Sequence, residues 1–299
     1  MKNTPRFALP GALLMGVIVA GGLYLAAAGS SEDLQLPKVV EAGSGFTIPT
    51  RAAGKSVLYI VSPAQVLRRN VEPGEAVVIA PGELHNAGHY LALLAGQGTT
   101  GKAEFDVVAA REPASVNFLA KPSRLPVSRP DGISGVAYVF DVFRNLLREP
   151  TPVSFQLSDS AGGTQTRSVA TRNGVAWAKM NSAPKAGAAQ FQVNVGSVSD
   201  KRVVEQVPGD PCNLRMSAQR SGQRMVLETA PVRDCSGNAV SDGTIISFTQ
   251  TYDGRSEATV DVPLKRDVAR TEMPARDGAV ISVATGVVMG NEIRVGGQR

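Results

Sequence analysis

The chain has 299 residues, of which 43% are hydrophobic, 19% charged and 5% aromatic, and its formal net charge is +5. This length allows two or three domains, and an apolar fraction near that of ordinary globular proteins excludes a wholly disordered chain. The charge is mild and forms no basic cluster with interleaved aromatic residues, which argues against nucleic acid as a partner.

The first 28 residues predict an export segment. Lys2 and Arg6 precede a run over residues 7–28 that spans 22 positions without a charged side chain. As a helix this run would be about 33 Å long, enough to cross the hydrocarbon core of a bilayer. It is longer than the apolar core of most secretory signals, yet the alanines before Gly29 suit a signal peptidase. Residues 1–28 are therefore expected to form a hydrophobic helix that is either a cleaved signal peptide or an uncleaved transmembrane anchor.

Either alternative places the rest of the chain outside the cytoplasm, because the basic end of such a segment stays inside. We expect an exported protein of the cell envelope, on its periplasmic or extracellular face, held to the membrane by the N-terminal helix if that helix is not cleaved. The polar residues 29–36 predict a spacer. Without residues 1–28 the chain keeps 29 basic and 26 acidic residues, a charge of +3.

The second part of the chain contains an internal repeat with a period of 93 residues. Asp141 and Asn145 bracket a turn before an apolar strand, and Asp234 and Asn238 do the same 93 residues later. Further pairs share this separation: Val153 and Ile246, Ser154 and Ser247, Phe155 and Phe248, Met180 and Met273. We infer two copies of one domain, over residues 114–207 and 208–299.

Each copy predicts a series of short β-strands. Residues 136–140 are β-branched and aromatic, and residues 190–195 alternate polar and apolar side chains. Glycine, proline and asparagine separate such runs at intervals of about 8–12 residues, a pattern typical of β-sandwiches. No helical periodicity of useful length follows residue 30. The predicted fold class is therefore all-β, with tandem sandwiches preceded by one hydrophobic helix.

Residues 37–113 predict a third, divergent sandwich. Residues 56–61 form a strong strand and residues 91–94 another apolar run, but neither fits the 93-residue period. Pro113 and Pro208 mark the boundaries between the three domains. The linkers are short, so we expect a stiff rod rather than flexibly joined domains.

The repeated turn and strand residues resemble the bacterial immunoglobulin-like domains of the invasin and intimin type. The resemblance rests on Asp141, Asn145 and residues 153–155, and most closely on residues 234–244. It covers about residues 114–299, and residues 37–113 more loosely. It implies immunoglobulin-like sandwiches that stack as a stalk on an exported protein. Only some domains of that family carry a binding tip, so the resemblance leaves the ligand open.

Cys212 and Cys235 are the only cysteines. In an exported chain such a pair favours a disulfide over free thiols or a metal or redox site. If a hairpin turns at residues 221–224, opposed residues have numbers that add up to about 447, as 212 and 235 do. The corresponding positions of the other copy hold Leu119 and Val142. The bridge is therefore expected to replace an apolar packing contact.

His85 and His89 are the only histidines and lie near Glu83. On a strand their spacing separates them by about 13 Å, too far for shared metal ligation, so both are expected at the surface or at a strand edge. The sequence contains neither a Gly-x-Ser-x-Gly nucleophile elbow nor a phosphate-binding glycine loop. We expect no catalytic residues, no metal site and no cofactor.

Two further features leave alternatives open. Oxygen atoms that would suit calcium occur at the repeated turns, although the same side chains are ordinary turn formers and that interpretation is favoured: Asp141, Asn145, Asp234, Asn238 and Asp242. Trp177, the only tryptophan, lies on an alternating strand and is expected to pack in the core. The alternative is a surface position that would bind carbohydrate.

These observations predict a structural or interaction protein of the bacterial cell envelope and not an enzyme. Its rod of domains would act as a stalk or docking module for a protein partner or a surface ligand. The alternative is an adhesive module or one that binds envelope polysaccharide, for which an aromatic content of 5% is low. A secreted hydrolase is a weaker alternative, because two histidines offer few acid–base groups.

Overall fold

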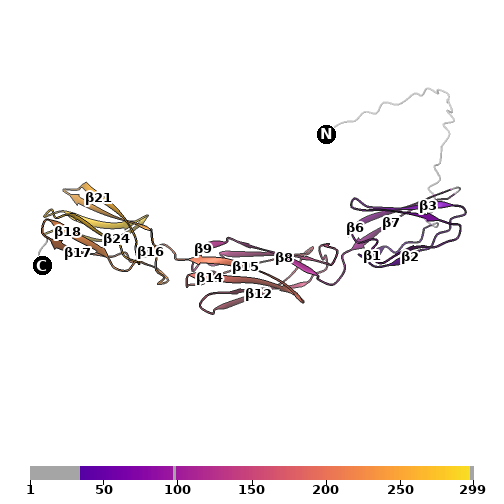
Figure 1. Ribbon diagram of the computed structural model, residues 1–299, viewed down its shortest axis with the longest axis horizontal. Helices are drawn as coiled ribbons and strands as arrows, with labels where there is room; N and C mark the ends of the chain where they lie inside the picture. Colours follow the sequence, from indigo (N-terminus) through magenta and orange to yellow (C-terminus); the bar gives the residue numbers. More distant parts are fainter. Residues whose placement is uncertain (1–33, 97–98, 297–299) are drawn as a thin grey trace, which may run out of the picture.

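The computed structural model describes residues 34–96 and 99–296, and Figure 1 shows them as three β-sandwiches arranged end to end. The regular secondary structure of this part consists of β-strands, which confirms the predicted all-β class. The described residues contain no helix that is long and apolar enough to cross a bilayer. The hydrophobic helix predicted over residues 1–28 lies outside the described residues, as does most of the predicted spacer. Leu34 is buried and bridges Thr50, so it already belongs to the first sandwich.

The central sandwich consists of two facing sheets. The larger has the strand order β12-β11-β14-β15-β9, with β9 parallel to β15: β9 (Arg124–Pro126), β11 (Pro152–Ser158), β12 (Thr164–Ala170), β14 (Gly187–Val195) and β15 (Val198–Val207). The smaller has the order β13-β10-β8: β8 (Ser115–Lys121), β10 (Ile133–Phe140) and β13 (Val175–Met180). Side chains along β10 alternate between buried and half-buried, as expected for a strand with one face on a core.

Three phenylalanines fill the core between these sheets. Phe118, Phe155 and Phe191 come from β8, β11 and β14, and all three are fully buried. Their ring centroids lie 4.9 to 6.2 Å apart, within the range of favourable aromatic contacts. Gly135 faces this cluster, and a Cβ atom there would lie 2.7 Å from the ring of Phe191. The cluster therefore requires glycine at this position of β10.

The first sandwich has the same strand order in its larger sheet, but its smaller sheet has no counterpart of β8 among the described strands. Its sheets have the orders β1-β7-β6-β3-β4, with β1 parallel to β7, and β2-β5: β1 (Val39–Glu41), β2 (Phe46–Ile48), β3 (Ser56–Val61), β4 (Val66–Val71), β5 (Val77–Ile79), β6 (Gly88–Gly96) and β7 (Thr99–Val108). Strands β6 and β7 begin 99 residues before β14 and β15. The first sandwich is thus a third copy of the same domain, at a spacing that differs from 93 residues.

The third sandwich follows the pattern at the predicted period. Its strands form sheets of order β21-β20-β23-β24 and β17-β18-β22, with a short β16-β19 pair: β16 (Pro211–Cys212), β17 (Met216–Ser221), β18 (Arg224–Thr229), β19 (Arg233–Asp234), β20 (Ile245–Tyr252), β21 (Arg255–Pro263), β22 (Arg270–Pro274), β23 (Val280–Thr285) and β24 (Val288–Arg294). Strand β20 begins 93 residues after β11.

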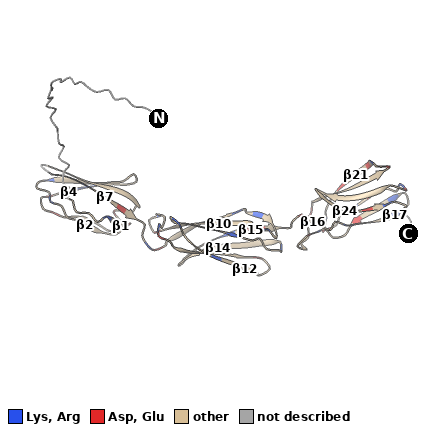
Figure 2. Ribbon diagram, turned by 180° about the vertical axis from the view of Figure 1, so that it is seen from behind, with Lys and Arg blue, Asp and Glu red and all other residues tan. Residues whose placement is uncertain are grey.

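Each sandwich has its own hydrophobic core, and the linkers between them are short. Only residues 109–114 separate β7 from β8, and residues 208–210 separate β15 from β16. Charged residues of both signs are spread over all three sandwiches, as Figure 2 shows. The arrangement leaves two small junctions at which the orientation of neighbouring sandwiches is decided.

Candidate functional site

Asp141 lies at the junction between the first two sandwiches. The buried carboxylate accepts hydrogen bonds at Oδ1 from the N–H groups of Phe143 and Asn145, at 2.9 and 2.8 Å. Its Oδ2 accepts from the N–H of Ala110 in the linker and from Nδ2 of Asn145, both at 2.9 Å. The carboxylate therefore closes the predicted turn and also fixes the linker to that turn.

Asn145 connects this turn to the first sandwich. Its Nδ2 donates to the carbonyl oxygen of His85 at 2.7 Å, and its Oδ1 accepts from the N–H of Ala87 at 2.8 Å. Both partners lie in the loop before β6. One amide thus satisfies a donor and an acceptor of a neighbouring backbone, which fixes the orientation of the two sandwiches as well as their separation.

The junction between the second and third sandwiches repeats these contacts. Asp234 accepts at Oδ1 from N–H groups of its own turn and at Oδ2 from the N–H of Gly209 in the linker, at 2.9 Å. Asn238 donates to the carbonyl oxygen of Pro184 at 2.8 Å and accepts from the N–H of Ala186 at 2.9 Å. We call each aspartate–asparagine pair, with these main-chain partners, a junction clamp.

In both clamps, hydrogen bonds engage the carboxylate oxygens that the sequence suggested as possible calcium ligands. The carboxylate oxygens of Asp141 and Asp234 accept from N–H donors, and Oδ1 of Asp242 accepts from the N–H of Arg266 at 2.8 Å. No group of three or more potential metal ligands occurs within residues 34–96 and 99–296. Asp141 and Asp234 thus form turns, whereas Asp242 contacts the main chain of a more distant loop.

The hydrogen bonds of the second clamp also set the ionisation of Asp234. Burial raises the pKa of this carboxyl, but the bonds from Gly209, Asn238 and Ser236 outweigh burial and bring the pKa below its ordinary value of 3.8. The carboxylate therefore stays ionised at neutral and mildly acidic pH, as its role as an acceptor of several N–H groups requires.

The two junctions differ at the centre of the turn. Phe143 packs against the core of the first sandwich, and its ring lies where a side chain on Gly43 would collide with it. Ser236, 93 residues later, instead places its Oγ 2.7 Å from Oγ of Ser128 in the central sandwich. The packing of Phe143 on the neighbouring domain was not predicted from the sequence. Its spacing from Asp141 places it in the turn but does not show which turn side chain contacts another domain.

A disulfide braces the second junction. Cys212 and Cys235 are bonded, with Cα atoms 5.0 Å apart. Cys212 lies opposite Arg233, so opposed residue numbers add up to 445 rather than the predicted 447, and the bridge runs diagonally between the strands. Cys235 directly follows Asp234. The bridge therefore ties the clamp turn to the first strand of the third sandwich.

The expected apolar counterpart of this bridge is absent, and that prediction was wrong. Leu119 and Val142 are 52% and 69% exposed and do not pack against each other as a buried pair. Leu119 is paired across the strands with Val136, on the outer side of the smaller sheet. The registers of β8–β10 and β16–β19 differ, so Leu119 is not the structural equivalent of Cys212, although Val142 and Cys235 both follow the aspartate of their turn.

The two histidines do not form a site together. The ring of His85 has Nδ1 3.1 Å from the carbonyl oxygen of Gly82. His89 is exposed on β6, as expected, with its ring nitrogens 3.0 Å from Asp106 and 3.6 Å from Glu104. His85 is half-buried at the first junction, where its ring centroid lies 5.9 Å from that of Phe143, whereas His89 is an exposed histidine beside carboxylates.

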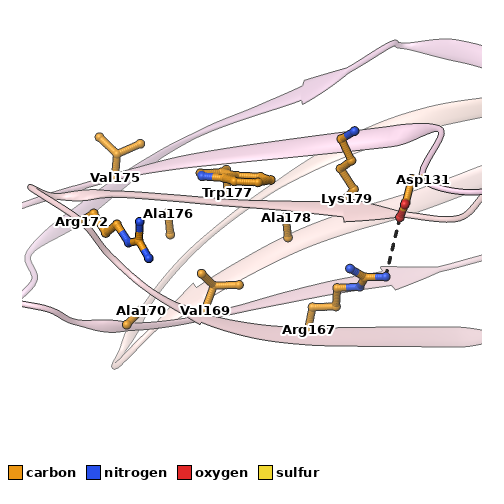
Figure 3. Close-up of a pocket in the computed structure, with 10 residues that line it drawn as sticks. All are labelled: Asp131, Arg167, Val169, Ala170, Arg172, Val175, Ala176, Trp177, Ala178 and Lys179. Carbon is orange, nitrogen blue, oxygen red and sulfur yellow. Dashed lines mark ion pairs between the residues drawn. The ribbon is translucent and has the colours of Figure 1, made fainter.

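Trp177 is 64% exposed, so the prediction that it packs in the core was wrong. Along β13 the buried side chains are Ala176, Ala178 and Met180, and Trp177 and Lys179 face outward. Below them lies a groove of about 680 Å³ between β12 and β13, shown in Figure 3. The sequence did contain a signal for this orientation. Residues two apart on a strand share a face, and a lysine at position 179 indicates that this face is exposed to solvent.

No family model matches the chain, and neither does any curated protein. Among solved structures, FdeC, an adhesin of Escherichia coli, is similar with a TM-score of 0.60 and 13% identity, over 88% of this chain and 96% of that one. Invasin, a bacterial integrin-binding protein, has a TM-score of 0.46 and 12% identity, over 84% of this chain and 56% of that one. The similarity to FdeC shows the fold of tandem immunoglobulin-like domains that the sequence resemblance implied.

Proposed function

We propose that this chain is an exported, membrane-tethered protein of the bacterial cell envelope whose three sandwiches form a stiff rod. The observation that carries the proposal is the presence of the same junction clamp at both junctions. In each clamp a side-chain amide forms hydrogen bonds with the main chain of the preceding domain. Such bonds restrict the rotation of one domain relative to the next, which flexibly joined domains would not require. Two such clamps, with the packing of Phe143 and the disulfide brace, hold three domains at defined angles.

Export and tethering are supported by two independent features. Residues 7–28 are uncharged and long enough to span a bilayer. The disulfide suits an oxidising compartment outside the cytoplasm. The adhesin FdeC, which has the same fold, supports an adhesive or docking role for the rod, with a protein or another surface ligand as its partner.

We propose a binding or spacing role without catalysis. A Ser-His-Asp triad needs a hydroxyl group at one imidazole nitrogen and a carboxylate at the other. The ring of His89 instead faces two carboxylates, and that of His85 faces a backbone carbonyl. These are the only histidines of the chain.

Removal of both clamp amides tests the rod. In the Asn145→Ala/Asn238→Ala variant we expect the angles between neighbouring sandwiches to spread widely in electron micrographs of single full-length molecules. Each substitution removes two hydrogen bonds between neighbouring sandwiches, worth about 0.5–1.5 kcal/mol each. Asn194→Ala is the matched control, because that amide contacts Gln192 within the central sandwich. An equally narrow angle distribution in the double variant would contradict the proposal.

Fractionation tests the tether. We expect the full-length protein to stay with the membrane pellet after alkaline extraction, since an apolar helix that spans the bilayer is not released by loss of electrostatic contacts. The mature N-terminus is then read by mass spectrometry. A soluble protein that begins at Gly29 would show that residues 1–28 are a cleaved signal, and it would overturn the tethered form of the proposal while leaving the rod intact.

A further inference from the structure

We propose that the free edge of β13 in the central sandwich is a docking site for an extended acidic segment of a partner protein, which would bind as an additional strand. This inference goes beyond the proposed rod and does not depend on it. It rests on four features of β13 and its surroundings: an unpaired edge, an exposed apolar row, an open groove beside it, and an excess of positive charge.

The main-chain groups of Trp177 and Lys179 face away from the sheet. Strand β13 pairs only with β10, where Val136 lies opposite Trp177. The N–H of Val139 donates to the carbonyl oxygen of Gly174, so that pair of opposed residues is hydrogen-bonded. In an antiparallel ladder such pairs alternate with non-bonded ones. Trp177 and Lys179 therefore present their N–H and C=O groups to an incoming strand.

The outer side of the smaller sheet offers apolar surface up to this edge. Leu119, Val136 and Trp177 lie opposite one another on β8, β10 and β13, in one row across the sheet. Leu119 is 52% exposed and Trp177 64%. An added strand on β13 would extend this row by one more side chain, which could pack on the indole ring.

The equivalent edges of the other two sandwiches are blunted. In the first sandwich β5 has only three residues. In the third sandwich β22 ends at Pro274, and its outward Arg270 and Glu272 pair with Glu228 and Arg224 on β18, at 3.7 and 3.5 Å. Short edges, paired charges and proline are the devices that prevent strand addition. The six-residue β13 is longer than β5 and has no proline and no paired charge, and its one outward charge, Lys179, would repel a basic strand but attract an acidic one.

The inward side chains of β13 beside the groove are small. Ala176 and Ala178 occupy positions that Val77 and Ile79 fill in β5 of the first sandwich, 99 residues earlier. Both alanines line the groove, with Val169 on the opposite side (Figure 3). Every second side chain of an added strand would point toward this groove, and the others would lie over the row that ends at Trp177.

The charge of the site selects an acidic ligand. Arg167 lies opposite the buried Phe155, so it faces the groove, where it contacts Asp131 at 3.7 Å. No carboxylate of the described part of the chain is within ion-pair distance of Arg172 or Lys179. The groove is thus lined by three cations and one carboxylate, with Arg172 at the opposite end from Asp131 (Figure 3).

The residues that correspond to Arg167 in the other two sandwiches do not add an unpaired cation to their grooves. Val260 stands at this position in the third sandwich and packs against its core. Arg69 stands there in the first sandwich and pairs with Glu83. This positive charge is shared with the third sandwich, whose matching groove is lined by Lys265, Arg266, Arg270 and Glu228, but only in the central sandwich does it lie beside an edge strand that is not blunted. It also disfavours a second copy of this chain as the occupant, because two such edges would bring like charges together.

The test uses the full-length protein and a synthetic peptide of about twelve residues in which glutamate alternates with valine. The control peptide carries lysine in place of each glutamate. Trp177 is the only tryptophan, so its fluorescence reports binding at this site. We expect the acidic peptide to shift the emission saturably and to slow hydrogen exchange at the amides of Trp177 and Lys179, and we expect the lysine peptide to do neither.

Matched variants separate the site from the overall charge. Lys179→Glu and Arg172→Glu should each weaken binding of the acidic peptide about tenfold. Lys201→Glu, on β15 of the same sandwich, makes the same charge change away from the groove and should leave binding unchanged. Equal losses in all three variants, or no saturable shift with the acidic peptide, would overturn the proposal.

Two further outcomes would assign the surface differently. Binding of alginate or heparin oligosaccharides without binding of the peptide would make it a site for acidic glycans. Dimerisation of the protein alone, abolished by Trp177→Ser, would make it a contact between copies of this chain. Either result overturns the docking proposal and leaves the rod unaffected.

Discussion

Replacement of Cys212 and Cys235 by serine is expected to lower the free energy of unfolding of the third sandwich by about 3 kcal/mol. The bridge closes a loop with a sequence separation of 23 residues, and its loss restores the freedom of that loop in the unfolded chain. Because Cys235 adjoins Asp234, the second junction clamp should loosen as well. Amide hydrogen exchange of the third sandwich, compared between the two proteins, measures the effect.

The central sandwich provides the internal control for this variant. Its unfolding can be followed by the fluorescence of Trp177 and should change much less than that of the third sandwich. Thiol titration of the denatured wild-type protein should find no free cysteine. Two free thiols, or an unchanged exchange rate in the third sandwich, would mean that the bridge contributes nothing to stability.

Phe191→Ala is expected to destabilise the central sandwich by about 3–5 kcal/mol. The ring is fully buried and lies 4.9 Å from Phe118 and 6.2 Å from Phe155, so its removal leaves a cavity that two other rings must line. Gly135, which lies against the same rings, cannot fill that space. Urea unfolding followed by Trp177 fluorescence reports the change in the domain that carries the mutation.

Leu119→Ala is the matched control for the core. It removes an aliphatic side chain from the same sandwich, but one that is 52% exposed on the outer face of β8. Its effect should stay below about 1 kcal/mol, since little apolar area is lost from the interior. Similar losses in both variants would mean that the aromatic cluster is not the centre of this domain's stability.

Much of the fold could be predicted from the sequence because its signals are local. β-Branched and aromatic composition identified the strand around residues 136–140, and period-two alternation identified the strand around residues 190–195. Turn residues marked the ends of both strands. The 93-residue period identified the relation between the second and third sandwiches. The first sandwich escaped this comparison, because its counterpart strands lie 99 residues away and few side chains are shared.

The candidate sites were less predictable because they depend on which face of a strand is covered. Trp177 and Lys179 alternate correctly with Ala176 and Ala178, but alternation does not say which of the two faces is the core. The contrast between a large aromatic residue and two alanines suggested the wrong face. The free edge of β13 and the groove beside it follow from the sheet order, which no local pattern contains.

The sequence by itself determined the all-β class and the aspartate and asparagine turns, because each is set by residues within a few positions of one another. It also determined the period of two copies, because the same local patterns recur 93 residues later. The structure alone decided what those turns do. Asn145 reaches the backbone of residues 60 and 58 positions away, and Asn238 does the same at the next junction. Such contacts are set by the packing of two separate cores, so a turn motif becomes a junction clamp only in the folded chain.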